Sequence, residues 1–172
     1  MVCAAMTAHH EESIELEPGV AGGFTQPLGM TPKSTEDRSM QLLGMKWGGI
    51  DAGLLQDPLE KLIALERPDG GWAQTPDLES DAYATGMVLY AMHELGVPAG
   101  AEAYRRGVTY LAQTQLPDGS WHVMSRSPKF QPYFQSGFPH NHDQWISSAG
   151  TAWATIALNY AIGGNPSRSS TQ

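Results

Sequence analysis

Hydrophobic positions along the chain define two kinds of predicted helix. Segments 57–66 and 101–113 carry apolar side chains at three- and four-residue spacing, with charged residues on the opposite face. Segments 82–92 and 149–162 contain no charged residue, and 38–47 is a weaker example of this kind. A helix without a polar face is enclosed by protein or faces a dry cavity. The alternation therefore predicts an inner row of apolar helices and an outer row of amphipathic ones.

A short turn sequence occurs twice in the chain. ERPDGGW (66–72) and TQLPDGSW (114–121) each follow a predicted amphipathic helix. The proline of each copy cannot continue the helix and suits the second position of a type I turn. Gly70 and Gly119 are expected to take a positive φ.

Each copy of the turn closes with a tryptophan, and Trp72 and Trp121 lie 49 residues apart. These rings are expected to fold back over the helix end and cover the junction between neighbouring hairpins. Self-similarity at this period is typical of stacked helical hairpins, so the predicted fold class is all-α. The buried faces of the outer helices are expected to hold Leu55, Leu59, Leu62 and Ile63 in the first and Tyr104, Gly107, Val108 and Leu111 in the second.

The composition excludes several classes of partner. Ten Lys and Arg against eighteen Asp and Glu give a net charge of −8, which argues against binding to nucleic acid or to an anionic membrane. The only cysteine, Cys3, excludes an internal disulfide and fits a reducing, cytoplasmic compartment. The uncharged stretch 145–162 is interpreted as a core helix rather than an integral membrane span, because it contains Ser, Thr, Asn and Gly. Peripheral contact with a membrane stays open.

Three regions follow from these patterns. Residues 1–35 are rich in Pro, Gly, Thr and Glu without a sustained period, and are expected to form an irregular, partly disordered arm. Residues 36–162 hold the helical repeats, and 163–172 are expected to form a disordered tail.

RGVTYLAQTQLPDGSW (106–121) has the arrangement Arg-Gly-x2-Tyr-Leu-x3-Gln-x3-Gly-x-Trp. This resembles the QW motif of squalene and oxidosqualene cyclases, a repeat shared with protein prenyltransferase β subunits. The upstream copy is looser, because Glu66 stands where Gln belongs although Gly70 and Trp72 match. The motif positions in the second copy are Arg106, Gly107, Tyr110, Leu111, Gln115, Gly119 and Trp121.

The resemblance implies a partial α/α toroid with a cavity near the N-terminal ends of the inner helices. It implies structural roles for Gln115, Gly119, Trp121, Gly70 and Trp72, since the motif Gln of that family is thought to cap a neighbouring helix and stack on the Trp. A closed toroid needs more hairpins than this chain supplies. The chain thus resembles a C-terminal portion of a larger protein, and we expect self-association, another partner, or a missing N-terminal toroid portion to complete it.

For function, the resemblance implies a terpenoid-cyclase-like isomerase, or part of one, that handles a polyprenyl substrate without a cofactor. A non-catalytic toroid module that binds an apolar ligand or a protein is the alternative. A zinc-dependent prenyltransferase-like unit is a third reading, but the Asp, Cys and His ligand set of that family has no counterpart here.

Cyclases of this kind protonate an alkene with an acid in an Asp-x-Asp-Asp cluster, and this chain has no such cluster. The nearest stretch is DLESD (77–81), directly before segment 82–92. Asp81 is either a general acid, its pKa raised by neighbouring carboxylates, or the cap of that helix.

SGFPHNHDQW (136–145) leads into the last apolar helix and holds the second candidate site. His140, His142 and Asp143 are close enough in sequence to share a metal ion, but a full site needs a further ligand, so no metal is assigned. We expect these residues to line the cavity mouth, with Phe134, Phe138 and Trp145 as apolar wall and Asp143 as a second catalytic candidate. Ordinary loop packing is the alternative.

Aromatic residues of the inner helices are candidates for the cavity wall, because π faces stabilise carbocations. Side chains at this spacing are also typical of a plain core. The candidates are Tyr83, Met87, Tyr90, Trp153 and Tyr160. If the mouth exists, Asp81 and Asp143 should open onto the same concavity.

Overall fold

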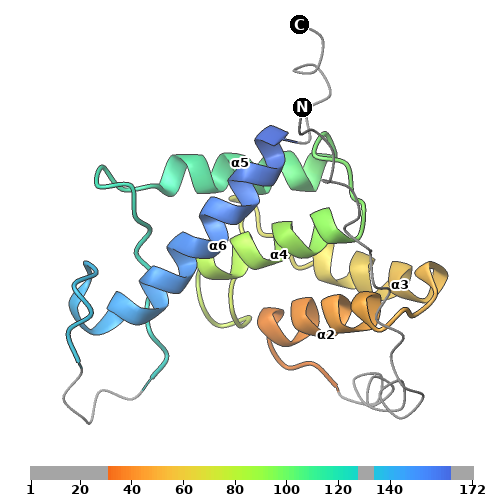
Figure 1. Cartoon of the computed structure of the whole chain (residues 1–172), viewed down its shortest axis with the longest axis horizontal. Coiled ribbons are helices and arrows are strands. Elements are labelled where there is room, and N and C mark those ends of the chain that lie inside the picture. Colours follow the sequence, from red (N-terminus) through yellow and green to blue (C-terminus); the bar gives the residue numbers. More distant parts are fainter. Residues whose placement is uncertain (1–30, 128–133, 164–172) are drawn as a thin grey trace, which may run out of the picture.

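The computed structural model describes residues 31–127 and 134–163, and this part of the chain is all-α, as predicted (Figure 1). The expected arm, apart from its last five residues, and nearly all of the expected tail lie outside the described residues. None of the described helices is long and apolar enough to cross a membrane. The helices are α2 (Thr35–Trp47), α3 (Ala52–Ile63), α4 (Ala82–Glu94), α5 (Glu102–Thr114) and α6 (Gln144–Gly163), the last preceded by the 3-10 turn η2 (Asn141–Asp143).

Helices α2, α4 and α6 run in the same general direction, and α3 and α5 return across them (Figure 1). α4 lies in the centre and packs against all four of the others. α3 leans on α2 and α4, while α5 leans on α4 and α6. This arrangement agrees with the predicted order of inner and outer helices. Because α2 and α6 lie on either side of α4, the described helices form a stack with two ends.

The outer helices bury the predicted faces. Leu55, Leu59 and Leu62 of α3 are buried, as are Tyr104, Gly107 and Leu111 of α5, whereas Ile63 and Val108 are partly buried. Hydrophobic spacing was therefore a sufficient guide to which side of each outer helix meets the core.

Helix α3 begins and ends earlier than the predicted segment 57–66. Asp51 caps its N-terminus by accepting a hydrogen bond from the backbone N–H of Gly53, at 2.8 Å. Pro58 lies inside the helix, whereas proline is usually tolerated only in the first turn. Proline removes the hydrogen bond to the carbonyl of Leu54, a residue that is itself exposed, so water can replace that bond.

The folded region also begins before residue 36. Ser34 and Asp37 form a reciprocal capping box at the start of α2. Thr35 is buried, and its hydroxyl donates to the carbonyl of Ala73 at 2.6 Å. The first residues of α2 are thus held by the segment that follows the first tryptophan turn.

Two glycines allow α4 and α6 to cross closely. A Cβ atom on Gly86 would lie 2.6 Å from the carbonyl carbon of Trp153, and one on Gly150 would lie 2.6 Å from Cγ2 of Val123. Such contacts are too short for a side chain, so glycine is required at both positions.

The two turns have the same backbone geometry. We call residues 66–72 the first turn and 115–121 the second turn. Gly70 and Gly119 have φ values of 85° and 84° and donate to the residue before the proline. A second bond, 2.9 Å long in both turns, closes each loop, and it runs from Arg67 N to Gly71 O and from Leu116 N to Ser120 O. The predicted type I start and positive-φ glycine are confirmed.

The tryptophans also take equivalent places. The indole N–H of Trp72 donates to the carbonyl of Leu62 at 3.1 Å, and that of Trp121 donates to the carbonyl of Leu111 at 2.9 Å. Both rings are buried. Each ring folds back onto the outer helix that precedes it, as expected, and satisfies a carbonyl near the end of that helix.

The apolar pattern of the last helix predicted enclosure, but this helix is open on one side, as expected for a stack with too few hairpins to close. α6 begins at Gln144, and one of its sides is open to solvent over the described residues. Because α6 lies at the end of the stack, α4 and α5 cover it from one direction only. The exposed side carries no charge and consists of Trp145, Ala152, Thr155, Ile156, Asn159, Tyr160 and Ile162.

Gln115 departs from what the family resemblance implies. It is exposed, and its Nε2 donates to the carbonyl of Gly119 in its own turn, at 3.0 Å. Among the described residues no hydrogen bond joins it to another helix.

Candidate functional site

The N-terminal ends of the three inner helices meet at one end of the stack. The hydroxyl of Tyr83, in the first turn of α4, donates to Oε1 of Glu36, in the first turn of α2, at 3.0 Å. The guanidinium of Arg126 lies 3.7 Å from the same carboxylate. Burial and the Glu36 carboxylate raise the pKa of Tyr83 to about 12, so this hydroxyl stays protonated and remains a donor.

Two neighbouring clefts open at this end, and both are bordered by Gln74. The larger has a volume of about 560 Å³ and combines apolar walls with one acid and one base; its lining includes Glu36, Tyr83, Arg126, Trp145 and Ile146. The smaller, about 300 Å³, is lined mainly by the loop before α4, with His122 and Met124 opposite. Asp81 belongs to the smaller cleft.

Asp81 caps α4. Its Oδ1 accepts from the backbone N–H of Ala84 at 2.8 Å, and its Oδ2 accepts from Nε2 of Gln74 at 2.9 Å. Burial raises the pKa of Asp81, and the hydrogen bonds from Ala84 and Gln74 oppose that shift. Glu79, the neighbour expected to raise it, is exposed and is not among the causes. The carboxylate thus has a structural role whatever its chemistry.

Asp143 anchors the loop before α6. Its Oδ1 accepts from the backbone N–H of Ser125 at 3.0 Å, and its Oδ2 lies 2.9 Å from Nε2 of His122. His122 lines the smaller cleft together with Asp81. The two carboxylates therefore lie at the same end of the stack, with the His122 side chain between Asp143 and the cleft that Asp81 borders.

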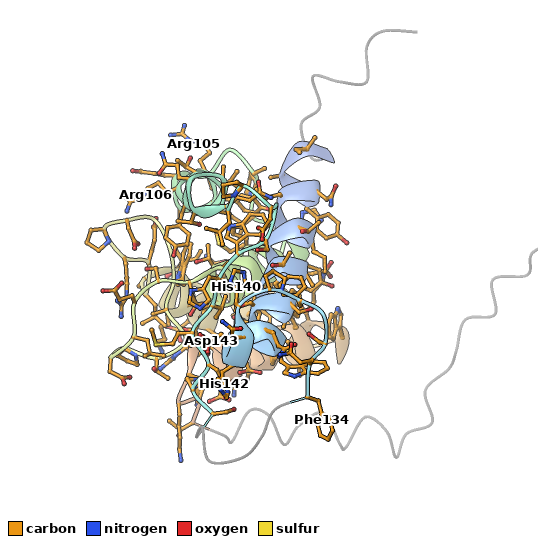
Figure 2. All side chains as sticks on the ribbon, turned by 90° about the vertical axis from the view of Figure 1, so that its left-hand side faces the viewer. Arg105, Arg106, Phe134, His140, His142 and Asp143 are labelled. Atoms are coloured by element: carbon orange, nitrogen blue, oxygen red, sulfur yellow. The ribbon has the colours of Figure 1, made fainter. Side chains whose placement is uncertain are left out.

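The three candidate ligands of the loop do not converge. His140 has a φ of 83°, and its Nε2 lies 3.0 Å from the hydroxyl of Ser120 in the second turn. His142 is exposed, and Figure 2 shows it apart from His140 at the other side of Asp143. Among the described residues no three His, Cys, Asp or Glu side chains gather as a metal site.

Asp118, Ser120 and His140 are the residue types of a hydrolase triad. Their hydrogen bonds run in an unsuitable order, because the serine rather than the histidine lies in the middle. The hydroxyl of Ser120 lies 2.7 Å from Oδ1 of Asp118, and its hydrogen bonds lower the pKa of that carboxyl. An ionised carboxylate can only accept, so the hydroxyl proton points to Asp118 rather than to the histidine. Ser120 is also buried. The arrangement fixes the loop onto the second turn and supplies no nucleophile.

The aromatic candidates divide into two groups. Met87 is buried in the core and cannot contact a ligand, so its expected cavity role is wrong. Tyr90 and Trp153 are partly exposed, with ring centroids 5.4 Å apart. Tyr160 extends this row, its ring lying 6.0 Å from that of Tyr90 and stacked on His93 at 4.0 Å.

The loop aromatics lie at the edge of the site. Trp145 is exposed, and its indole N–H donates to the carbonyl of Phe134 at 3.2 Å. Phe134 points away from the body of the molecule (Figure 2). Phe138 is partly buried with its ring 6.2 Å from that of His140, which places it on the loop rather than in the larger cleft.

Several residues of this end were not predicted. Glu36, Gln74, His122 and Arg126 bind or border the candidates, although they lie in different segments. Glu36 could have been predicted, because it lies in the first turn of an apolar helix, as Tyr83 does. Arg126 lies in irregular chain without a motif, so no pattern pointed to it.

No family model matches the chain, and no curated protein is detectably similar to it. The likeness to QW-motif proteins therefore rests on residues 66–72 and 106–121 alone.

Proposed function

We propose that this chain is a helical-hairpin module that binds an elongated apolar molecule of isoprenoid type along α4 and α6. The supporting observation is a path of partly exposed apolar rings that leads away from the larger cleft. Tyr83 and Tyr90 are seven residues apart on α4, and Ile146, Trp153 and Tyr160 follow the same spacing on α6. Side chains seven apart share one face of a helix.

These two rows of side chains, one on α4 and one on α6, meet where the helices cross. Tyr90 contacts Trp153 and Tyr160, and Gly86 and Gly150 keep the helices close beneath them. Covering these rings would release water from apolar surface, at about 25 cal/mol per Å². An extended hydrocarbon chain fits such a path better than a compact polar ligand.

The cleft suits the polar end of such a molecule. Arg126 and Glu36 border it, while Trp145 and Ile146 provide apolar wall. Its volume of about 560 Å³ lies within the range of small-molecule sites. A prenyl alcohol can thus direct its hydroxyl to the charged pair and its chain along the rings.

Binding of a fluorescent prenyl alcohol to the full chain tests this proposal. Trp145→Ala and Tyr160→Ala should each raise the Kd about tenfold, because loss of each exposed ring removes about 1–2 kcal/mol of binding free energy. Leu54→Ala is the matched control, since Leu54 is an exposed apolar residue on the outer helix α3. Equal affinity in all four proteins would reject the path.

One observation favours a second function, cyclisation with Asp81 as general acid. Asp81 borders a cleft and burial raises its pKa, as an acid catalyst requires. Asn is as good a helix cap as Asp, so Asp81→Asn should preserve folding. Loss of turnover of a prenyl substrate without a change in melting would support the acid, whereas a wild-type rate would leave Asp81 as a cap.

A further inference from the structure

We propose that residues 115–119 of the second turn are a docking site for an arginine on an amphipathic helix of a partner polypeptide. The first turn shows what such a contact looks like, because α5 occupies it. The second turn has the same backbone and tryptophan geometry, but its residues 115–119 are exposed, whereas Ser120 and Trp121 are buried by other described residues.

The arginine of α5 holds the first turn from outside. Nε of Arg106 donates to Oε1 of Glu66 at 2.6 Å, and its NH2 donates to the carbonyls of Arg67 and Pro68 at 3.0 and 3.4 Å. One guanidinium thus binds a carboxylate and two consecutive turn carbonyls, a geometry that suits its rigid fork of donors.

The glycine and tyrosine that follow complete the contact. A Cβ on Gly107 would lie 3.0 Å from the ring of Trp72, so only glycine lets α5 approach this closely. Tyr110 packs against Gly71, and its hydroxyl donates to the carbonyl of Ser80 at 2.6 Å. The first half of the QW-like motif therefore binds the preceding turn, while its second half builds a turn of its own.

At the second turn the part of this surface that corresponds to the arginine contact is open, whereas Ser120 and Trp121, which correspond to Gly71 and Trp72, are already buried. Gln115, Leu116, Pro117 and Gly119 are all exposed, and the loop lies at the edge of the molecule (Figure 1). Gly70 is buried with Arg106 backbone 2.9 Å from its Cβ position, but only the Gln115 side chain, at 4.0 Å, lies near that of Gly119. No lysine or arginine of the described segments binds residues 115–119.

A second copy of this chain is a poor occupant. Its α5 is already bound to its own first turn through Arg106. Its α3, aligned by the two tryptophans, has Asp57, Pro58 and Lys61 where α5 has its arginine, glycine and tyrosine. A carboxylate facing two turn carbonyls is repelled, and proline cannot replace the glycine beneath a ring. The partner must bring the cation that α3 lacks.

Fusing a probe helix to the full chain tests this inference. A copy of residues 97–114 joined to the C-terminus by a flexible linker gives a high effective concentration. We expect the melting temperature to rise by about 2–4 °C over the same fusion with Arg106→Glu in the copy. Arg105→Glu in the copy is the matched control, because Arg105 is exposed on α5 and its side chain lies apart from that of Arg106 (Figure 2).

Substitutions at Gln115 of the second turn test the other side of the same contact. Gln115→Glu recreates the carboxylate of Glu66, so it should enlarge the difference between the Arg and Glu copies, and Gln115→Lys should abolish it. Equal melting of the Arg106→Glu and unchanged copies would overturn the inference. A gain seen only in dimers by light scattering would also overturn it, since the helix would then have exchanged between copies.

Discussion

The first and second turns share one local design and differ in what surrounds them. Both use proline, a positive-φ glycine and a buried tryptophan bonded to the helix before it. The first is covered by α5 through Arg106, whereas residues 115–119 of the second face solvent. The turn geometry therefore does not depend on a covering arginine, and α5 adds to the first turn rather than creating it.

The largest effect should come from the tryptophans themselves. Trp72→Ala and Trp121→Ala should each destabilise the fold by about 3–5 kcal/mol, because each leaves a large cavity and an unsatisfied carbonyl. Trp72→Ala should cost more, since α5 packs on its ring through Gly107. Urea denaturation measures both, with the exposed Trp47→Ala as control. Equal, small losses of stability in both variants would show that neither ring is needed to cover the junction between hairpins.

The turn glycines separate backbone strain from crowding. Gly119→Ala should cost about 1 kcal/mol, the strain of a positive φ in open space. Gly70→Ala should cost about 2–4 kcal/mol, because its Cβ would also lie 2.9 Å from the carbonyl oxygen of Arg106. Melting curves of the two variants provide the comparison. Identical losses would mean that α5 does not press on the first turn.

The charged contact of the first turn should be weaker. Arg106→Ala should cost about 1 kcal/mol, because the arginine side chain is 42% exposed and its pair with Glu66 is partly screened. Gln115→Ala at the second turn should change stability by less than about 0.5 kcal/mol. A double-mutant cycle with Glu66→Gln isolates the pair, and a coupling energy of zero would assign the loss to the turn carbonyls alone.

The smallest predicted effect is a pH dependence that distinguishes two carboxylates. The pKa of Asp81 is raised by burial, so its stabilising contribution is greatest at low pH and is lost as pH rises through that pKa, above 3.8. Asp81→Asn should therefore gain stability relative to wild type on going from pH 3 to neutrality.

Asp118, beside the second turn, should behave in the opposite way. Hydrogen bonds from Ser120 lower its pKa below 3.8, so its contribution is present at neutral pH and is lost on acidification. Asp118→Asn should be destabilising at pH 7 and not at pH 2. Thermal melts of both variants over this range give the two slopes, and slopes of the same sign would contradict these assignments.

Much of the fold was predictable because its signals are local. Charge-free and amphipathic segments identified the inner and outer helices, and the faces of α3 and α5 followed from leucine and aromatic spacing. The start of α3 was missed because the predicted segment began at Asp57, whereas Asp51 caps the helix six residues earlier. The candidate site was harder, since Arg126 and His122 reach it from irregular chain.

The sequence by itself determined the two turns, the order of helices and the buried side of each outer helix, because dihedral preferences and hydrophobic spacing act within a few residues. Only the tertiary structure decided that Arg106 binds Glu66 across 40 residues, that Met87 is core while Tyr90 and Trp153 are surface, and that one side of an uncharged helix is open. Those outcomes depend on which neighbours are present. An apolar side chain has the same hydrophobicity in a core and at the end of a stack, and only the packing around it distinguishes the two.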